Sequence, residues 1–252
     1  MVEIWMFSSA KGGVGKSFVS TNLGIGLSKI RKRVLVVDLD LTTGNLHTFF
    51  GSPFVGNNLG HYIDGQMKLT DVIKKSPFTD CDYIQSVPKF SDDYFADYKK
   101  TAQLIADLRS LPYDYIFLDT SSAVSQTNLN LINLVDKVFA ITTPELASLE
   151  RTHRWFDHVM DKKVEIDHFN ILVNFCRTIQ HNTLGFGLQS VLQKKFGFNC
   201  GIIGHLPFDN AAWQSSMANQ NLFKTFPASA FCHEIYRFSK QFIDSEQLRA
   251  VS

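Results

Sequence analysis

The chain has few of the features that mark secreted, membrane-spanning or disordered proteins. It contains only four cysteines, Cys81, Cys176, Cys200 and Cys232. Because no two of them form a C-x-x-C pair, no zinc or iron–sulfur site is indicated, and reduced cytosolic thiols are the better interpretation. No apolar run approaches the ~18 residues of a membrane-spanning helix. There is no low-complexity tract or internal repeat, and a net charge of +1 gives the whole chain no polyanion-binding signature.

What the sequence does contain is an alternation of strand-like and helix-like segments. With 252 residues and 44% hydrophobic content, the chain is expected to form one α/β domain over 1–252. Strands are predicted near 2–8, 33–38, 82–87, 115–119, 137–142, 170–174 and 201–206. Helices are predicted near 16–29, 69–75, 97–110, 125–134, 146–161, 183–196, 210–219 and 229–244. This order predicts a mainly parallel, twisted sheet with helices on both faces. Residues 42–66 are the least regular part, and they are either a partner-binding loop or a plain surface connection between elements.

A glycine-rich loop follows the first predicted strand directly. Lys11 to Ser17 read KGGVGKS, which ends as the phosphate-binding pattern G-x-x-x-x-G-K-[ST] does, with Ala10 in place of its first glycine. Such loops curl their N–H groups around phosphate oxygens, and the helix that follows points its positive end at the same anion. Lys16 can reach the β- and γ-phosphates, and the Ser17 hydroxyl can ligate Mg²⁺. The predicted nucleotide-binding residues here are Gly12, Gly13, Val14, Gly15, Lys16, Ser17 and Phe18.

The lysine at the start of this loop, Lys11, is not part of the general phosphate-binding pattern and indicates a more specific class of nucleotide-binding protein. The pattern K-G-G-x-G-K-[ST] resembles the deviant Walker A motif of the MinD/ParA ATPases, in particular their MinD- and FlhG (FleN)-like members. The resemblance implies a single-domain P-loop NTPase fold, ATP and Mg²⁺ as cofactors, and an ATP-dependent homodimer. It also implies that Lys11 reaches across the dimer interface to the partner's nucleotide, where a cation supplied in trans is typically worth ~10³–10⁵ in rate.

Two carboxylates follow the second predicted strand. Asp38 and Asp40 point to the same side of an extended chain, at the strand end where α/β sheets bind ligands. On its own, such a pair of aspartates more often caps a helix or is solvated. Here the segment that begins with the pair resembles the family's D-x-D-x-G-x-x-N segment. By that resemblance Asp38 helps to hold the Mg²⁺ shell, and Asp40 positions or activates the attacking water. Thr42 stands where MinD-like members have glycine, so we expect a different loop shape.

A third acidic residue and a dimer-facing segment complete the stronger matches. The strand at 115–119 ends in Asp119, a Walker B pattern whose carboxylate can hold Mg²⁺ through water. The family continues as D-[TS]-P-[AP]-G, whereas this chain reads DTSSA over 119–123, so an altered switch loop and slow turnover are expected. The TTPE sequence that ends at Glu145 resembles the start of the family's dimer-facing helix.

Two weaker segments resemble the adenine-binding strands of the family. ILVN ends at Asn174, in the position of an asparagine that contacts adenine, and an amide can both donate and accept. GHLPFD ends at Asp209 and resembles G-x-[IL]-P-x-D, which implies that Pro207 and Asp209 line the base. The resemblance runs from about residue 2 to about residue 243. It implies catalytic roles for Lys11, Lys16 and Asp40, and metal binding by Ser17, Asp38 and Asp119.

Binding to DNA or to membranes is only weakly indicated. Basic clusters occur at 29–33, 151–154, 162–163 and 194–195, but solvated helix ends are favoured over the non-specific DNA binding of ParA-like relatives. An apolar stripe over 231–242 falls where the family has its last core helix, and the tail after 243 is short and polar. We therefore expect weak or absent autonomous membrane binding, and a cytoplasmic protein that a partner recruits to a pole or to the inner membrane face.

Three functional classes are compatible with these motifs. The favoured one is an ATP-dependent dimerisation switch that controls the placement or number of a cellular structure. ATP would join two subunits, hydrolysis would release them, and an unidentified protein partner would sense the dimer. The alternative is an ATP-dependent metabolic ligase on the same scaffold, which needs a small-substrate pocket that no motif marks. A reductase like the nitrogenase iron protein would need paired cysteines, which the spacing does not suggest.

Overall fold

The chain forms one sheet of eight strands within the residues that the computed structural model describes, 2–87, 92–122, 125–161, 169–197, 201 and 203–251. The strand order is β3-β4-β2-β5-β1-β6-β7-β8. The strands are β1 (Glu3–Ser8), β2 (Val34–Asp38), β3 (Lys74–Lys75), β4 (Asp82–Ile84), β5 (Tyr115–Asp119), β6 (Lys137–Thr142), β7 (Phe169–Cys176) and β8 (Ile203–Pro207). Each of these pairings is parallel except that of β3 with β4. The predicted mainly parallel α/β sheet is confirmed.

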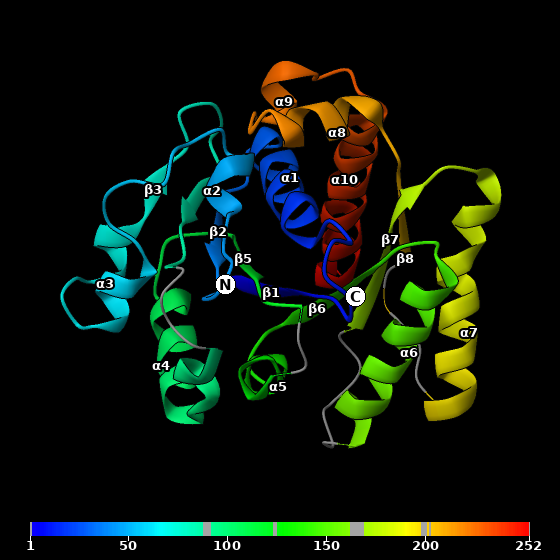
Figure 1. Ribbon diagram of the computed structural model, residues 1–252, viewed down its shortest axis with the longest axis horizontal. Helices are drawn as coiled ribbons and strands as arrows, with labels where there is room; N and C mark the ends of the chain where they lie inside the picture. The colour runs from blue at the N-terminus through cyan, green and yellow to red at the C-terminus, as the bar shows by residue number, and fades with distance from the viewer. Residues whose placement is uncertain are drawn as a thin grey trace.

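Helices cover both faces of this sheet (Figure 1). They are α1 (Lys16–Lys29), α2 (Leu46–Phe49), α3 (Leu59–Ile63), α4 (Tyr98–Arg109), α5 (Gln126–Ile132), α6 (Leu146–Asp161), α7 (Leu184–Phe196), α8 (Asn210–Met217), α9 (Leu222–Thr225) and α10 (Ala230–Val251). Short 3-10 helices are η1 (Leu69–Val72), η2 (Asp92–Ala96) and η3 (Ile179–Thr183). Figure 1 shows α1, α8, α9 and α10 on one side of the sheet, and α4, α5, α6 and α7 on the other.

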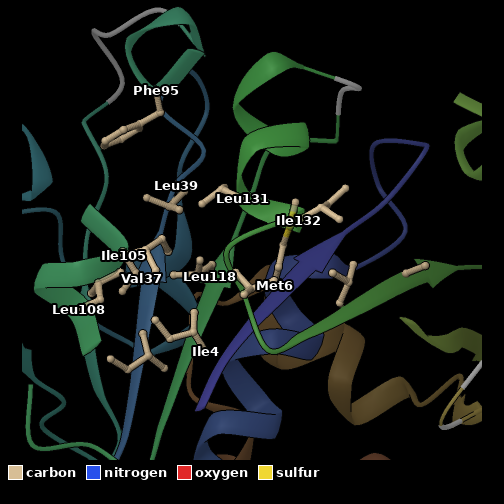
Figure 2. Packing of buried hydrophobic residues seen from close by; sticks show 14 of the residues in the cluster. Ile4, Met6, Val37, Leu39, Phe95, Ile105, Leu108, Leu118, Leu131 and Ile132 are labelled. Carbon is tan, nitrogen blue, oxygen red and sulfur yellow. The ribbon is translucent and has the colours of Figure 1, made fainter. Parts of the chain in front are cut away.

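Each face of the sheet carries its own hydrophobic core. Ile4 and Met6 of β1 belong to the core that α4 and α5 cover (Figure 2). Trp5 and Phe7 of the same strand belong to the opposite core, with α1 and α10. Successive strand residues point to opposite faces, so a strand covered on both sides needs apolar residues at every position. This double coverage is why β1, β2 and β5 read as continuous apolar runs.

The apolar stripe of α10 belongs to the second core. Phe231, Ile235, Phe238 and Phe242 are each only 1–2% exposed. The ring of Phe242 lies 4.8 Å from that of Trp5, centroid to centroid. The interpretation of this stripe as core packing is therefore confirmed. Across the described part of the chain, no helix has the length and apolar character to cross a membrane.

Several element predictions were wrong in detail. The helix predicted at 69–75 is a single 3-10 turn, η1, followed by the two-residue strand β3. Leu69 and Val72 are both buried, and their spacing of three suits one 3-10 turn as well as an α-helix. The predicted loop at 42–66 contains α2 and α3, and α10 extends to Val251, well past the predicted end at 244. Residues 123, 162–163, 200 and 202 lie outside the described residues.

The contact of α1 with α10 leaves no room for a side chain at Gly26. A Cβ there would lie 2.7 Å from Ile235 Cγ2 and 2.8 Å from Ser239 Oγ. Gly26→Ala is expected to lower the free energy of unfolding by about 1–3 kcal/mol through overpacking, which outweighs a helix-propensity gain of up to ~1 kcal/mol. Gly187→Ala in α7 meets no atom within 4 Å and is the matched control. Urea unfolding compares the two variants, and equal midpoints would contradict the packing argument.

Candidate functional site

A cavity of about 380 Å³ opens at the carboxyl end of the central strands. Its floor is the loop between β1 and α1, and further walls come from the segments after β2 and β8 and from the end of β7. Crevices at this end of a parallel sheet are where α/β folds bind ligands. The cavity is lined by Ser9, Lys11, Gly12, Gly13, Val14, Gly15, Lys16, Ser17, Phe18, Asp40, Thr43, Asn45, Phe49, Ser122, Phe175, Pro207, Phe208, Asp209, Ala212, Trp213, Ser216 and Phe231.

The glycine-rich loop has the shape that phosphate binding requires. Gly13 and Gly15 have φ angles of 78° and 84°, a region that disfavours any residue with a side chain. A Cβ on Gly15 would also overlap the amide of Asn174, which donates from Nδ2 to the Val14 carbonyl at 2.9 Å. The helix α1 then starts at Lys16, as predicted. The free N–H groups at the start of α1 therefore face the cavity, and a phosphate anion fits this loop.

Lys16 and the carboxylates of two neighbouring strands meet beneath this loop. Lys16 Nζ lies 2.6 Å from Asp119 Oδ1, and the two side chains are 8% and 1% exposed. Asp38 pairs in register with Asp119 at the ends of β2 and β5. Burial and the charge of Asp119 raise the pKa of Asp38 well above its usual range, although the N–H groups of Leu46 and Asp40 donate to it. Together with the Ser17 hydroxyl, these carboxylates offer oxygen ligands of the kind that Mg²⁺ prefers.

Asp40 lies at the cavity wall and accepts hydrogen bonds from the residues two and three positions further along the chain. Its carboxylate receives the backbone N–H and the hydroxyl of both Thr42 and Thr43. Burial raises the pKa of Asp40, but these hydrogen bonds outweigh burial and leave the pKa below its usual value. The loop that holds these hydrogen bonds requires glycine at position 44. A Cβ on Gly44 would lie only 2.5 Å from the Asp40 carbonyl oxygen.

Lys11 lies at the rim of the cavity and forms an ion pair within its own chain. Its Nζ is 2.6 Å from Glu145 Oε2, and the side chains are 33% and 65% exposed. Glu145 directly precedes α6, whose first residue, Leu146, is 82% exposed. The sequence of this segment resembles the family's dimer-facing helix start, but it does not indicate that Glu145 lies beside Lys11. Both partners are accessible to a second molecule, so the pair can be exchanged for another at little cost.

The cavity wall is more aromatic than the sequence suggested. Phe175, Phe208 and Trp213 line it. Phe208 lies within the GHLPFD segment without having been singled out, and no motif contains Phe175 or Trp213. Phe175 has a φ of 61° and lies within the register shift of β7 between Val173 and Cys176. This irregularity places Asn174 under the loop and the Phe175 ring at the cavity wall. A flat apolar group such as a nucleobase fits between aromatic walls of this kind.

The residues predicted to contact a base occupy different places. Pro207 and Asp209 line the cavity, but both carboxylate oxygens of Asp209 already accept backbone N–H groups, from Ala211 and Phe231. Asn174 does not line the cavity. It is fully buried, and its Oδ1 has no hydrogen-bond partner. Asp38 and Asp119 are also buried and are not among the residues that line the cavity.

Known proteins resemble this chain in sequence and in fold. A family described as an AAA domain matches residues 2–167, more than half of the chain. The chain belongs to this family as a MinD/ParA-type member. The septum site-determining protein MinD of Bacillus subtilis (strain 168) is 27% identical over 179 residues, which are 70% of this chain and 66% of that protein. The antiactivator FleN of Pseudomonas aeruginosa is 22% identical over 235 residues, 90% of this chain and 81% of that protein.

The fold of this MinD/ParA-type chain also matches a solved structure. MinD from Pyrococcus horikoshii OT3, complexed with Mg-ADP, has a TM-score of 0.79 at 22% identity, with 96% of each chain covered. This likeness shows the fold. In sequence, the chain spans only 66%, 63% and 58% of the lengths of the first three MinD proteins that it matches. The activity of this MinD/ParA-type chain is therefore argued from its own residues.

Proposed function

We propose that this protein is an ATP-dependent dimerising ATPase that controls the placement or number of a cellular structure. The observation that carries the proposal is the position of Lys11, at the cavity rim with its Nζ on the exposed Glu145. Lys16 is already paired with Asp119 in the buried floor of the same site. Lys11 is a second and accessible cation at the rim, so it can contact the nucleotide of another subunit, as an arginine finger does. The names of two relatives, the septum site-determining protein MinD and the antiactivator FleN, support a regulatory role.

The cavity fits Mg-ATP as the substrate. The loop N–H groups and Lys16 would hold the phosphates, and Phe175, Phe208 and Trp213 would enclose the base. Ser17, with Asp38 and Asp119 behind it, would hold Mg²⁺, which when bound neutralises phosphate charge. The Mg-ADP complex of the Pyrococcus horikoshii MinD supports this assignment.

Asp40 is the group that we assign to the attacking water. It lines the cavity, and the hydrogen bonds from Thr42 and Thr43 keep it ionised at neutral pH, so it can accept a hydrogen bond from water. We expect slow hydrolysis without a protein partner, because the segment after Asp119 lacks the proline and glycine of the family's switch loop. Ser122 of this segment lines the cavity.

The favoured partners are a second copy of this chain and an unidentified protein. Several of the basic residues that suggested DNA binding are engaged in ion pairs of their own: Arg33 with Asp114, Arg154 with Glu150, and Lys195 with Asp157. Their charge is partly neutralised, so DNA binding stays the less favoured alternative. Because the stripe of α10 is buried, membrane binding by these apolar side chains is not expected either. We propose a cytoplasmic protein that its partner recruits to its place of action.

The test is the mass of the protein in solution, measured by light scattering with Mg-ADP and then with Mg-ATP. We expect a monomer with ADP and a dimer with ATP. Asp40→Ala should hold the dimer most firmly, because without Asp40 the bound ATP is not hydrolysed. Asp64→Ala, which removes an exposed carboxylate beyond the cavity lining, is the control and should behave as wild type does. A monomer in every state would contradict the switch and favour the ligase hypothesis.

A further inference from the structure

The carboxylate of Asp40 is held unequally at its two oxygens. Oδ1 accepts the Thr42 N–H at 3.2 Å, the Thr42 hydroxyl at 2.9 Å and the Thr43 N–H at 2.9 Å. Oδ2 accepts the Thr43 hydroxyl at 2.9 Å. An ionised carboxylate has about four lone-pair directions over its two oxygens. Oδ1 is therefore saturated, whereas Oδ2 keeps a direction in which it can accept a further hydrogen.

The backbone beneath this carboxylate is fixed independently of the two threonine hydroxyls. The Ser86 hydroxyl donates to the Asp40 carbonyl at 2.8 Å, and the Asp40 N–H donates to Asp38 Oδ1 at 3.1 Å. Gly44 packs against the same carbonyl, where no Cβ would fit. The remaining freedom of Asp40 is thus the rotation of its carboxylate. With Oδ1 as the pivot, the Thr43 hydroxyl is the group in the described structure that fixes where Oδ2 points.

We infer that Thr43 is a positioning residue for ATP hydrolysis, acting through Asp40. Asp40 and Thr43 both line the cavity, so Oδ2 is held at the face where the proposed water would be received. The hydroxyl of Thr43 fixes the carboxylate plane and leaves one acceptor direction of Oδ2 for that water. Thr42 makes a superficially similar contact, but its hydroxyl shares Oδ1 with two backbone N–H groups and is redundant. This inference rests on the proposed function.

The two neighbouring threonines provide a matched experiment. Valine has nearly the shape of threonine but no hydroxyl, and both side chains are exposed. Thr43→Val is expected to lower kcat for ATP about tenfold with KM within about twofold, because loss of orientation affects the transition state more than binding. Thr42→Val removes one of the three donors to the saturated Oδ1 and is expected to lower kcat clearly less than Thr43→Val does. Thr43→Ser restores the hydroxyl and should recover most of the wild-type kcat.

The readouts separate this inference from the proposed function on which it rests. Steady-state hydrolysis of ATP, which gives kcat and KM, and ATP-dependent dimerisation are measured for wild type and the three variants. If wild type dimerises and hydrolyses ATP but Thr43→Val keeps its kcat, or raises it, the positioning role of Thr43 is wrong and the proposed function stands. Equal losses in both valine variants, or failure of Thr43→Ser to recover, would likewise overturn it. If wild type does not hydrolyse ATP, the proposed function fails and this inference fails with it.

Discussion

Replacing Lys11 with alanine is expected to lower ATP hydrolysis by about three orders of magnitude while ATP binding stays close to that of wild type. The phosphate floor of the cavity is built by Lys16 and the loop N–H groups, and it does not require the Lys11 side chain. The ion pair of Lys11 with Glu145 is exposed, and such pairs contribute at most about 1 kcal/mol to stability. Single-turnover hydrolysis and titration with a fluorescent ATP analogue measure the two quantities separately. Stable ATP-dependent dimers should also be lost.

Mixing two inactive variants tests whether Lys11 acts across the dimer. A Lys11→Ala subunit keeps its own Asp40 but lacks the lysine, whereas an Asp40→Ala subunit can still supply Lys11. In a mixed dimer, the site on the Lys11→Ala subunit would regain both groups, so the mixture should hydrolyse ATP although neither variant does so alone. If the mixture stays inactive while mixed dimers form, Lys11 does not act in trans. Normal turnover by Lys11→Ala alone would also contradict the model.

Lys16→Ala is expected to abolish ATP binding at concentrations that saturate wild type, a loss of roughly 100-fold or more in affinity. Lys16 is the buried cation of the cavity floor, and its ammonium is the group that would meet the β- and γ-phosphates. Its loss also leaves Asp119 buried without its partner, next to Asp38. Breaking a buried pair in this way typically costs about 3–5 kcal/mol, so the free energy of unfolding should fall as well.

The binding loss must therefore be separated from unfolding. Circular dichroism should show that Lys16→Ala is folded at the temperature of the titration. The double variant Lys16→Ala/Asp119→Asn removes the unpaired charge and should recover stability without recovering ATP binding. Lys29→Ala, an exposed lysine at the other end of α1, is the matched control and should bind ATP normally. Measurable ATP binding by a folded Lys16→Ala would refute the assigned role.

Much of the fold could be predicted because the parallel strands are buried on both faces. β1, β2 and β5 each appear as an uninterrupted apolar run, and α1 and α6 were predicted with their observed bounds. The misses occur where several structures satisfy the same pattern. Leu69 and Val72 suit a helix, but Ile73 has an extended backbone and β4 pairs with the two residues that follow. A strand of two residues carries too little periodicity to be recognised.

The parts of the candidate site that lie within one short segment of the chain could be predicted from the sequence. The loop from Lys11 to Ser17 specifies its own conformation, since only glycine suits the φ angles at Gly13 and Gly15. Contacts between distant segments were not predictable. Lys11 meets Glu145 across 134 residues, and Lys16 meets Asp119 across 103. The aromatic wall depends on a register shift in β7 that leaves no mark in the sequence around Phe175.

The sequence by itself determined the parallel α/β architecture and the phosphate-binding loop, because strand burial and glycine conformation are properties of short segments. Only the tertiary structure decided how the charged groups are arranged. It paired Lys16 with a buried carboxylate and Lys11 with an exposed one, and it gave Asp40 a saturated oxygen and an open one. Such pairings depend on which strand ends lie side by side and on which lone pairs are already used. Both follow from packing across the whole sheet.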